Sequence, residues 1–338
     1  MVKSSENIVS SYLAAIDTEL QQALMPSINH GNPLLYDMLT YHLGWQDKDD
    51  NYKTSGKRIR PLLTLLTCSA SGGDWQRALP AAAAVELVHN FSLIHDDIED
   101  NSALRRGRPT VWKKWGIPQA INAGDAMFTL AHLHSIRLAD LISPSVAILA
   151  AEILQNACLQ LTQGQYLDLE FEKRDEVSID DYWSMVEGKT AALISASAEL
   201  GALSSLCDEL MRNTYRNFGR LLGLAFQVQD DFLGIWGNSL LTGKSTQSDL
   251  LTRKKTLPVI YGLSKHGLFA KRWKLPVRAE DTDELTYILE SEGGKVFTQV
   301  KGNELINQAL LELERADPRE ISGKVLKELA ISLSTRQM

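Results

Sequence analysis

Apolar residues recur at intervals of three or four along most of the 338-residue chain, and Ala, Leu, Glu, Gln and Arg dominate the same stretches. This spacing predicts amphipathic helices, which Gly and Pro residues separate. The predicted helices cover residues 5–25, 58–71, 78–101, 118–140, 145–172, 180–204, 208–236, 255–266, 282–291, 301–315 and 319–335. Since no stretch alternates convincingly with a period of two, we expect an all-α fold.

Two of the predicted helices are apolar on more than one face, at residues 81–88 and 190–203. A helix that is apolar nearly all round belongs in the interior of a protein. The chain has no internal repeat and no low-complexity linker. We therefore expect residues 1–338 to form a single domain, a helical bundle or barrel around a deep central cavity.

Three carboxylates share one face of the predicted helix 78–101. Asp96 and Asp100 lie about 40° apart around the helix axis, and Asp97 is within about 100° of both. Like charges this close repel each other unless a cation holds them together. Oxygen ligands favour magnesium over softer metals. A solvated acidic helix end is the alternative explanation.

A second acidic group strengthens the metal interpretation. Asp230 and Asp231 sit inside the apolar stretch 221–235, and Gln227 shares an arc of about 100° with them. Two acidic faces in two apolar helices, far apart in the sequence, predict facing halves of one metal site.

Basic residues follow or accompany each acidic group. Lys57 and Arg60 open a predicted helix, where the helix dipole and free N–H groups favour anions. Further basic residues come after the first and second acidic groups, namely Arg105, Arg106, Lys244 and Lys254. Guanidinium groups bind phosphate oxygens in pairs, and lysine supplies a mobile charge. Solvated faces are the alternative, but repetition beside each acidic group favours magnesium–diphosphate chemistry.

Seven ordered motifs carry a resemblance to a known family. They are G-K-R-I-R-P at 56–61, V-E-L-V-H-N-F-S-L-I-H-D-D-I-E-D at 85–100, R-R-G-R-P-T at 105–110, G-Q-Y-L-D at 164–168, G-K-T at 188–190, F-Q-V-Q-D-D-F-L-G at 226–234, and T-G-K at 242–244 with K-K-T-L-P behind it. The chain resembles the trans-isoprenyl diphosphate synthases of the polyprenyl synthetase family, most strongly over about 56–258. The resemblance implies a helical fold of the isoprenoid synthase type, a homodimer, and magnesium-dependent head-to-tail condensation of isopentenyl diphosphate with an allylic diphosphate (dimethylallyl, geranyl or farnesyl).

The resemblance also implies roles for individual residues. Three magnesium ions would be held by Asp96, Asp100 and Asp230, with Asp97 and Asp231 completing the acidic rims. The allylic diphosphate would be bound by Arg105, Lys189, Lys244 and Lys254, with Thr190 and Gln227 facing the reacting carbons. The isopentenyl diphosphate would be bound by Lys57, Arg60, His89 and Arg106. Gln165 and Asp168 would support the network on the metal side.

The chain departs from the family pattern at Gly234, where the second acidic motif often ends in Asp. One carboxylate is therefore expected to be missing, although we expect activity to survive. For product length, the resemblance assigns the floor of the cavity to Phe91, with the small residues Ser92 and Val88 beside it. Phe91 alone, with no insertion in 96–100, resembles geranylgeranyl diphosphate synthases, which make a twenty-carbon product. A farnesyl or a longer, five-unit product remains the alternative.

Two other functional classes compete with a synthase. A non-catalytic partner subunit would be expected to lose the acidic motifs, which this chain keeps. A terpene cyclase shares metal-triggered ionisation but has no use for a second diphosphate site, which Lys57, Arg60, His89 and Arg106 indicate.

Net charge and cysteine content narrow the setting. With 35 Lys and Arg against 42 Asp and Glu, the net charge of −7 disfavours nucleic acid and anionic membranes as partners. It does not exclude diphosphates, because bound magnesium would reverse the local charge of the aspartates. Three widely spaced cysteines indicate neither a disulfide framework nor a zinc site and suit a reducing compartment. The longest uncharged stretch, 153–167, is too short and polar to span a bilayer. We expect a cytoplasmic protein without stable membrane insertion.

Overall fold

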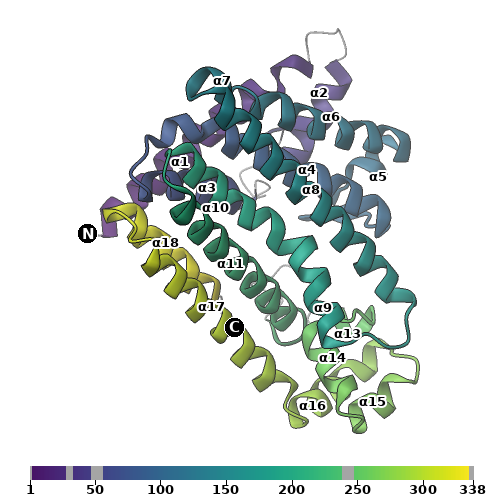
Figure 1. Ribbon diagram of the computed structural model, residues 1–338. Coiled ribbons are helices and arrows are strands. Elements are labelled where there is room, and N and C mark those ends of the chain that lie inside the picture. Colours follow the sequence, from purple (N-terminus) through teal and green to yellow (C-terminus); the bar gives the residue numbers. More distant parts are fainter. Residues whose placement is uncertain (1, 28–32, 47–55, 238–246, 335–338) are drawn as a thin grey trace. The chain divides into compact units, whose positions relative to one another are not determined.

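The computed structural model describes residues 2–27, 33–46, 56–237 and 247–334. The described chain is helical nearly throughout (Figure 1), and the β-structure within it is one hairpin of two-residue strands. The prediction of an all-α fold is therefore confirmed. The chain divides into two compact units: unit 1 comprises Met1–Asn156, Ala196–Asn213 and Pro318–Val325, and unit 2 comprises Ala157–Ser195, Thr214–Asp317 and Leu326–Met338. A single domain with a central cavity stays a prediction.

Unit 1 takes most of its helices from the first half of the chain. They are α1 (Val2–Leu24), α2 (Pro33–Leu43), α3 (Ile59–Ala70), α4 (Leu79–Glu99), α5 (Val111–Trp115), α6 (Ile117–Ser135) and α7 (Leu138–Leu141), with 3₁₀ turns η1 (Met25–Ser27) and η2 (Trp75–Ala78) and strands β1 (Leu104–Arg105) and β2 (Arg108–Pro109). Helix α4 packs against α1, α3 and α6. Its residues from 81 to 88 are buried on every side, which confirms the predicted interior position of this stretch.

Unit 2 is built around α9 (Ile179–Val186), a π-helical segment η3 (Glu187–Ala191), and later helices. These are α13 (Ser248–Leu251), α14 (Leu257–Ser264), α15 (Leu268–Trp273), the 3₁₀ turn η4 (Ala279–Asp281), α16 (Thr282–Ser291) and α17 (Gly294–Arg315). Four further helices contribute residues to both units: α8 (Pro144–Lys173), α10 (Ala192–Ser204), α11 (Glu209–Trp236) and α18 (Glu320–Ser334).

Two apolar clusters form the interior of unit 2. One joins α9, α11 and α14 through side chains that include Tyr182, Leu224 and Leu257. The other joins α14, α15 and α16, which lie together at the lower end of Figure 1, through side chains that include Phe269 and Leu289. The first cluster lies directly beneath the second acidic motif, because Val228 belongs to it.

Several helix boundaries differ from those predicted. The predicted helix 118–140 is interrupted after Ser135, where Arg137 N bonds His134 O in a tighter three-residue turn before α7 begins. The predicted helix 301–315 begins earlier, at Gly294, because Gly293 adopts φ 89° and starts the helix instead of ending a loop. Helices α2, α5 and α15 were not predicted, since each is short and surrounded by Gly, Pro or polar residues.

Helix α8 has the length and apolar content that a membrane-crossing segment would need, and it is the one such helix in the described ranges. It extends over 30 residues, well beyond the uncharged stretch 153–167. Core helices of soluble proteins also satisfy these criteria, and 44% of its most apolar window is buried.

Candidate active site

Helix α4 ends immediately after its acidic motif. Asn101 adopts a left-handed conformation with φ 52°. Asn101 N donates to Ile98 O at 3.1 Å, and Ser102 N donates to Asp97 O at 2.9 Å. This pair of bonds is a Schellman motif, which satisfies the last carbonyls of a helix. The motif leaves Asp100 exposed at the helix end, one turn from the partly exposed Asp96.

The middle aspartate of this motif faces inward. Asp97 is 1% exposed, and Arg105 Nε donates to its Oδ1 and Oδ2 at 2.9 and 3.0 Å. Burial raises the pKa of Asp97, and the hydrogen bond and charge of Arg105 offset that only in part. Arg105 belongs to β1, and Arg106 and Gly107 form the turn to β2 with φ 52° and 77°. Positive φ at both turn residues is the geometry of a tight two-residue hairpin.

The cations predicted to bind isopentenyl diphosphate gather in unit 1. Arg60 Nη1 lies 3.3 Å from His89 Nε2. Because a guanidinium can only donate, this ring nitrogen is the acceptor, so the imidazole is neutral. Burial, followed by the charges of Arg60 and Arg106, holds the pKa of His89 well below its usual range. A side chain on Gly56 would come within 2.8 Å of Arg106 Nη2, so the backbone beside Lys57 also adjoins this cluster.

The electrostatics of this cluster favour binding of an anion. Burial lowers the pKa of Arg60 to about 10, and burial together with Arg105 lowers the pKa of Arg106. Arg60 Nε is buried and has no hydrogen-bond partner among the residues described. Buried donors without partners are costly unless a ligand satisfies them. A bound diphosphate would supply both acceptors and compensating charge.

Helix α2 adds residues to this region that the sequence did not reveal. Tyr41 and His42 line a small pocket together with Asp97, Arg105, Arg106, Arg108, Pro109, Thr110 and Val111. Tyr41 Oη donates to Pro109 O at 2.8 Å, and Arg108 Nη2 donates to Tyr41 O at 2.9 Å. Burial and the neighbouring arginines lower the pKa of His42 to about 3. No motif signals these two residues, since α2 lies outside the resembling stretch.

In unit 2 a carboxylate gathers the lysines predicted to bind the allylic diphosphate. Lys189 Nζ donates to Asp168 Oδ2 at 2.5 Å, and Lys254 Nζ lies 4.0 Å from the same oxygen. Burial raises the pKa of Asp168, but the two lysines outweigh it and leave that pKa lowered. The predicted support by Asp168 thus has a geometric basis. Gln165, its predicted companion on α8, is buried one turn earlier.

A close backbone contact sets the position of Lys189. A side chain on Gly164 of α8 would come within 2.1 Å of Lys189 N, and one on Gly188 within 2.5 Å of Gln160 O. Only glycine fits at either position. The π-helical segment η3 carries Gly188, Lys189 and Thr190, and such segments occur frequently at functional sites.

The second acidic motif repeats the division seen in the first. Asp230 is exposed, whereas Asp231 is 3% exposed and accepts three hydrogen bonds. Tyr182 Oη and Leu257 N donate to Oδ2 at 2.7 and 2.9 Å, and Gln227 Nε2 donates to Oδ1 at 2.8 Å. Burial raises the pKa of Asp231 to about 6 despite these bonds. Tyr182 cannot be recognised from the sequence, because a single tyrosine 49 residues before Asp231 belongs to no motif.

Gln227 also connects the motif to η3. Thr190 Oγ1 donates to Gln227 Oε1 at 2.7 Å. The amide oxygen and nitrogen of Gln227 therefore have fixed directions, with the oxygen towards Thr190 and the nitrogen towards Asp231. Gln227 therefore links Thr190 of η3 to Asp231, with which it shares an arc of α11.

The departure at Gly234 has a structural counterpart. A side chain on Gly234 would meet Asp249 Oδ2 at 2.0 Å and Oδ1 at 3.2 Å. The carboxylate of Asp249, from α13, therefore occupies the space beside α11 where a fifth-position aspartate would begin. The sequence predicts that a carboxylate is missing at position 234. It does not reveal that the carboxylate of Asp249 lies beside this position.

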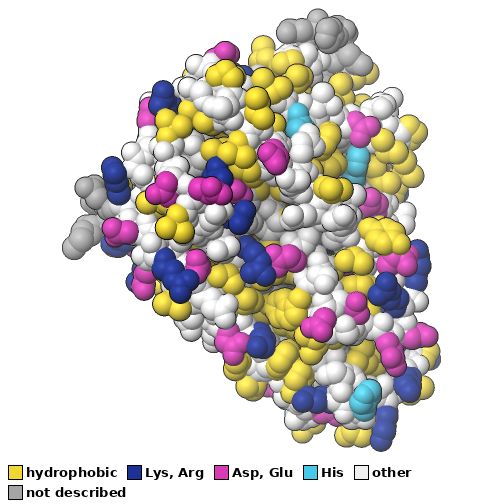
Figure 2. Space-filling view, in the orientation of Figure 1, with side chains coloured by type: hydrophobic (Ala, Val, Ile, Leu, Met, Phe, Trp, Pro, Cys, Tyr) yellow, Lys and Arg dark blue, Asp and Glu magenta, His cyan; other side chains and the backbone are white. Residues whose placement is uncertain are grey.

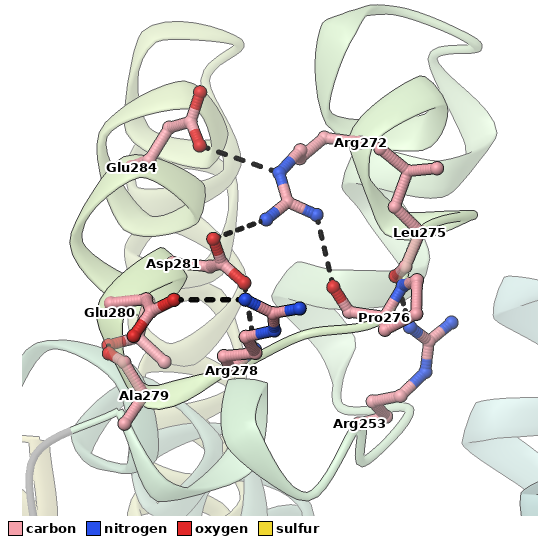
Figure 3. Close-up of polar contacts among 10 residues, drawn as sticks. Arg253, Arg272, Leu275, Pro276, Arg278, Ala279, Glu280, Asp281 and Glu284 are labelled. Atoms are coloured by element: carbon pink, nitrogen blue, oxygen red, sulfur yellow. Dashed lines mark hydrogen bonds and ion pairs between the residues drawn. The ribbon is translucent and has the colours of Figure 1, made fainter.

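The loop that carries Lys254 is anchored by its neighbour Arg253 (Figure 3). Arg253 donates to Leu275 O at 2.8 Å, as Figure 3 shows. It also donates to Trp273 O at 2.6 Å. Beside it, Arg272 holds η4 and α16 to α15 through Asp281 Oδ1 at 2.7 Å and Glu284 Oε2 at 3.4 Å. Lys244, predicted as a further diphosphate ligand, lies outside the described residues.

Phe91, the predicted floor of the cavity, lies on the surface of α4 that meets α6. The ring of Phe91 is 5.1 Å from that of Phe128 and 5.4 Å from that of His95, both edge-on. Ser92 Oγ donates to His89 O at 2.8 Å, and Val88 is fully buried. Phe91 therefore has an aromatic neighbour on α6 that sequence spacing could not identify.

The fit of magnesium can be judged from the carboxylates. Among the described residues, no three His, Cys, Asp or Glu side chains form a ready-made metal-binding group. Magnesium in phosphate-handling sites is typically held by one or two carboxylates, with phosphate and water oxygens as the other ligands. In unit 1, Asp96 and Asp100 reach the surface while Asp97 binds a protein donor, and in unit 2, Asp230 reaches the surface while Asp231 binds protein donors. Each motif taken by itself fits magnesium bound together with a diphosphate.

Comparisons with known proteins agree with the motifs. Residues 47–290 match the family model described as polyprenyl synthetase. The chain is 40% identical over 317 residues to a (2E,6E)-farnesyl diphosphate synthase of Mycobacterium tuberculosis, covering 90% of this chain and 87% of the relative. It is 42% identical over 291 residues to a geranylgeranyl diphosphate synthase of the same organism, covering 83% and 82%. The two relatives are nearly equally similar, so identity does not decide between their products.

A solved structure extends the agreement to the fold. A polyprenyl synthetase from Streptomyces coelicolor superimposes with a TM-score of 0.86 at 34% identity, covering 96% of this chain and 99% of that one.

Proposed function

Because the chain belongs to the polyprenyl synthetase family and is a prenyltransferase, we propose that it condenses isopentenyl diphosphate head-to-tail with an allylic diphosphate, giving geranylgeranyl diphosphate as its main product. In this reaction the allylic C–O bond breaks and its electrons leave with diphosphate. The isopentenyl double bond forms the new C–C bond, and the released diphosphate takes the proton that is lost.

The observation that best supports two substrates is the presence of two separate groups of cations. In unit 1, Arg60 and Arg106 surround the neutral His89, and Arg60 Nε is buried without a partner among the described residues. In unit 2, Lys189 and Lys254 flank Asp168. A cyclase with one diphosphate substrate would need only one such group.

We assign the first group, with Lys57, to isopentenyl diphosphate. Arg60 and Arg106 would donate to its phosphate oxygens, and His89 would orient Arg60 by accepting from Nη1. We assign Lys189, Lys254 and Lys244 to the allylic diphosphate. Arg105 already bonds Asp97, so its effect on that substrate would come mainly through its charge.

Magnesium would be held by Asp96, Asp100 and Asp230, with Asp97 and Asp231 fixing the backbone that carries them. When bound, the metal neutralises diphosphate charge and makes diphosphate a better leaving group. Thr190 and Gln227, held to each other at 2.7 Å, would present fixed dipoles to the reacting carbons.

Phe91 supports the twenty-carbon product. A single half-buried aromatic on α4, backed by Phe128, would close the hydrocarbon channel at one level, while Ser92 leaves the adjacent space open. Farnesyl diphosphate is the alternative product, because the farnesyl-forming relative matches 90% of the chain at 40% identity and the geranylgeranyl-forming relative matches 83% at 42%.

We also propose a cytoplasmic homodimer. Helix α6 exposes large apolar side chains at Ile117, Ile121 and Leu133, which a second copy could cover. On the face shown in Figure 2, basic and acidic side chains are interspersed, so no broad basic field favours a nucleic acid or an anionic membrane. Light scattering should give twice the monomer mass, and a monomer would contradict the dimer alone.

The function is tested by incubating the protein with labelled isopentenyl diphosphate and dimethylallyl, geranyl or farnesyl diphosphate in turn. Label should enter a longer prenyl chain with magnesium and should not with a chelator present. A cyclase would instead release a hydrocarbon from the allylic substrate alone, and a partner subunit would release nothing.

Paired variants tie the result to the acidic motif. Asp100→Asn should abolish incorporation, since it removes an exposed magnesium ligand. Asp140→Asn, on α7 of the same unit, removes a surface carboxylate outside the motifs and should leave incorporation unchanged. Equal activity in both variants would argue against the assigned role of Asp100.

A further inference from the structure

Arg58 is the residue that turns the chain into α3. It is the N-cap residue of the helix, with φ 50° and ψ 34°. Residues other than Gly, Asn and Asp seldom adopt this left-handed backbone conformation. Its carbonyl accepts the first helical bond, from Leu62 N at 3.1 Å. Lys57 directly precedes it, and Arg60 lies in the first turn that follows. The conformation of Arg58 therefore sets the direction of both cations.

A buried ion pair holds the side chain of Arg58. Arg58 Nη1 lies 2.8 Å from Glu86 Oε1, and both side chains are only 5% exposed. The same carboxylate oxygen accepts from Asn90 Nδ2 at 3.0 Å. A second, longer contact joins Arg58 Nη2 to Asp17 Oδ1 at 3.5 Å. Breaking a buried pair leaves an uncompensated charge, so this geometry resists change.

The Arg58–Glu86 ion pair lies close to a second contact between the start of α3 and α4, which joins Arg60 to His89. Glu86 precedes His89 by three residues on α4, so the two side chains project from one face. His89 Nε2 holds Arg60 Nη1 at 3.3 Å. The start of α3 is thus attached to one strip of α4 twice, through Arg58 and through Arg60.

We propose that the Arg58–Glu86 ion pair is a positioning element of the isopentenyl diphosphate site. It keeps Arg58 in its left-handed conformation and thereby aims Lys57 and Arg60 at the diphosphate. Arg58 and Glu86 are assigned as positioning residues, because both side chains are buried and paired with each other. The inference rests on the proposed function, because it takes Lys57 and Arg60 as ligands of that diphosphate.

The test measures binding of isopentenyl diphosphate alone by calorimetry, and the KM of each substrate by kinetics. In Glu86→Gln we expect the dissociation constant and the KM for isopentenyl diphosphate to rise about 10- to 100-fold, as when a misplaced group costs orientation. The KM for the allylic diphosphate should stay within about twofold, because its ligands lie in another part of the chain. A general loss of folded protein would instead lower the apparent kcat and leave the KM values of both substrates unchanged.

Two further variants separate positioning from folding. Arg58→Met/Glu86→Leu removes both charges, so it leaves no unpaired ion and should fold, yet it should show the same selective loss. Glu19→Gln alters another buried glutamate of unit 1, which pairs with the exposed Arg137 at 2.9 Å, and should bind isopentenyl diphosphate like the parent.

The outcomes divide cleanly. The positioning role would be overturned if Glu86→Gln and the Arg58→Met/Glu86→Leu double variant bound isopentenyl diphosphate like the parent. It would also be overturned if these variants lost affinity for the two substrates equally. If the unaltered protein itself failed to bind isopentenyl diphosphate, the proposed function would fall instead, and the variants would not be needed to decide it.

Discussion

Arg105 Nε donates to both carboxylate oxygens of Asp97, at 2.9 and 3.0 Å, and so holds the hairpin that follows α4 against the end of that helix. Asp231 is bound in the same way by Tyr182, Gln227 and the backbone of Leu257. In each acidic motif the second aspartate is thus buried in the scaffold, while the first reaches solvent.

Asp97→Asn and Asp100→Asn should therefore have different effects. Asp97→Asn replaces one of the two oxygens that accept from Arg105 Nε with an NH2 group, which places a donor against a donor in a buried site and should cost about 1–3 kcal/mol of unfolding free energy. Asp100→Asn alters an exposed side chain and should change stability by no more than about 0.5 kcal/mol, although activity is lost. Urea denaturation together with the prenyl-transfer assay checks both. Equal stability of the two variants would contradict the division of roles.

Phe91→Ala should lengthen the dominant product. The substitution removes the ring that packs edge-on against Phe128, and on the proposed assignment it lowers the floor of the hydrocarbon channel. Chromatography of the alcohols released from the products measures the change. Phe171→Ala, a buried aromatic of the unit 2 core, serves as control and should lower stability without lengthening the product. An unchanged product distribution in Phe91→Ala would show that Phe91 is not the floor.

Glu19 should make stability depend on acid pH. Burial raises the pKa of Glu19, but His134 at 2.7 Å and Arg137 at 2.9 Å outweigh burial and leave it below 4.5. Since the folded pKa is depressed, the stabilisation is present above pH 4.5 and is lost as pH falls through the folded pKa. At pH 7, Glu19→Gln should cost about 1–3 kcal/mol, and the difference from the parent should shrink as the pH falls through the folded pKa of Glu19. Urea midpoints measured over a series of pH values from 7 downward test this, and a constant difference would exclude the charge as its cause.

Gly234→Ala should destabilise the protein, because the new methyl group would lie 2.0 Å from Asp249 Oδ2. We expect a net loss of about 0.5–2 kcal/mol, because an overpacking cost of about 1–3 kcal/mol exceeds the gain in helix propensity of about 0.5–1 kcal/mol. Gly302→Ala on α17 is the matched control. Its methyl group would meet Val228 at an ordinary 3.5 Å, so the better helix propensity of alanine should stabilise by about 0.5–1 kcal/mol. Thermal melts of both variants should shift in opposite directions.

The helices were predictable because each depends on local spacing. Helix α16 begins and ends at the predicted residues, and α4 and α11 contain both acidic motifs as expected. Interior positions followed as well, since a stretch that is apolar all round leaves no face for water. The family and the prenyltransferase activity expected from the motifs are confirmed by the comparisons.

The partners of the aspartates could not be predicted in the same way. Helical angles show that Asp97 and Asp100 share an arc, but they do not tell which one faces the interior. That depends on Arg105 eight residues later and, for Asp231, on Tyr182 forty-nine residues earlier. Likewise, nothing in the spacing of 226–234 reveals that Asp249 would fill the space beside Gly234. Contacts between residues far apart in the sequence therefore determine which aspartate is buried and what lies beside Gly234.

The contact between Gly164 and Gly188 has a consequence for recombining this chain with its relatives. A side chain on Gly164 would overlap Lys189 N, and one on Gly188 would overlap Gln160 O, so each segment leaves room only for a glycine in the other. A crossover point placed between residues 164 and 188 would join two halves that had not been selected together. Chimeric enzymes should therefore inherit this stretch as one block, with their junctions placed outside it.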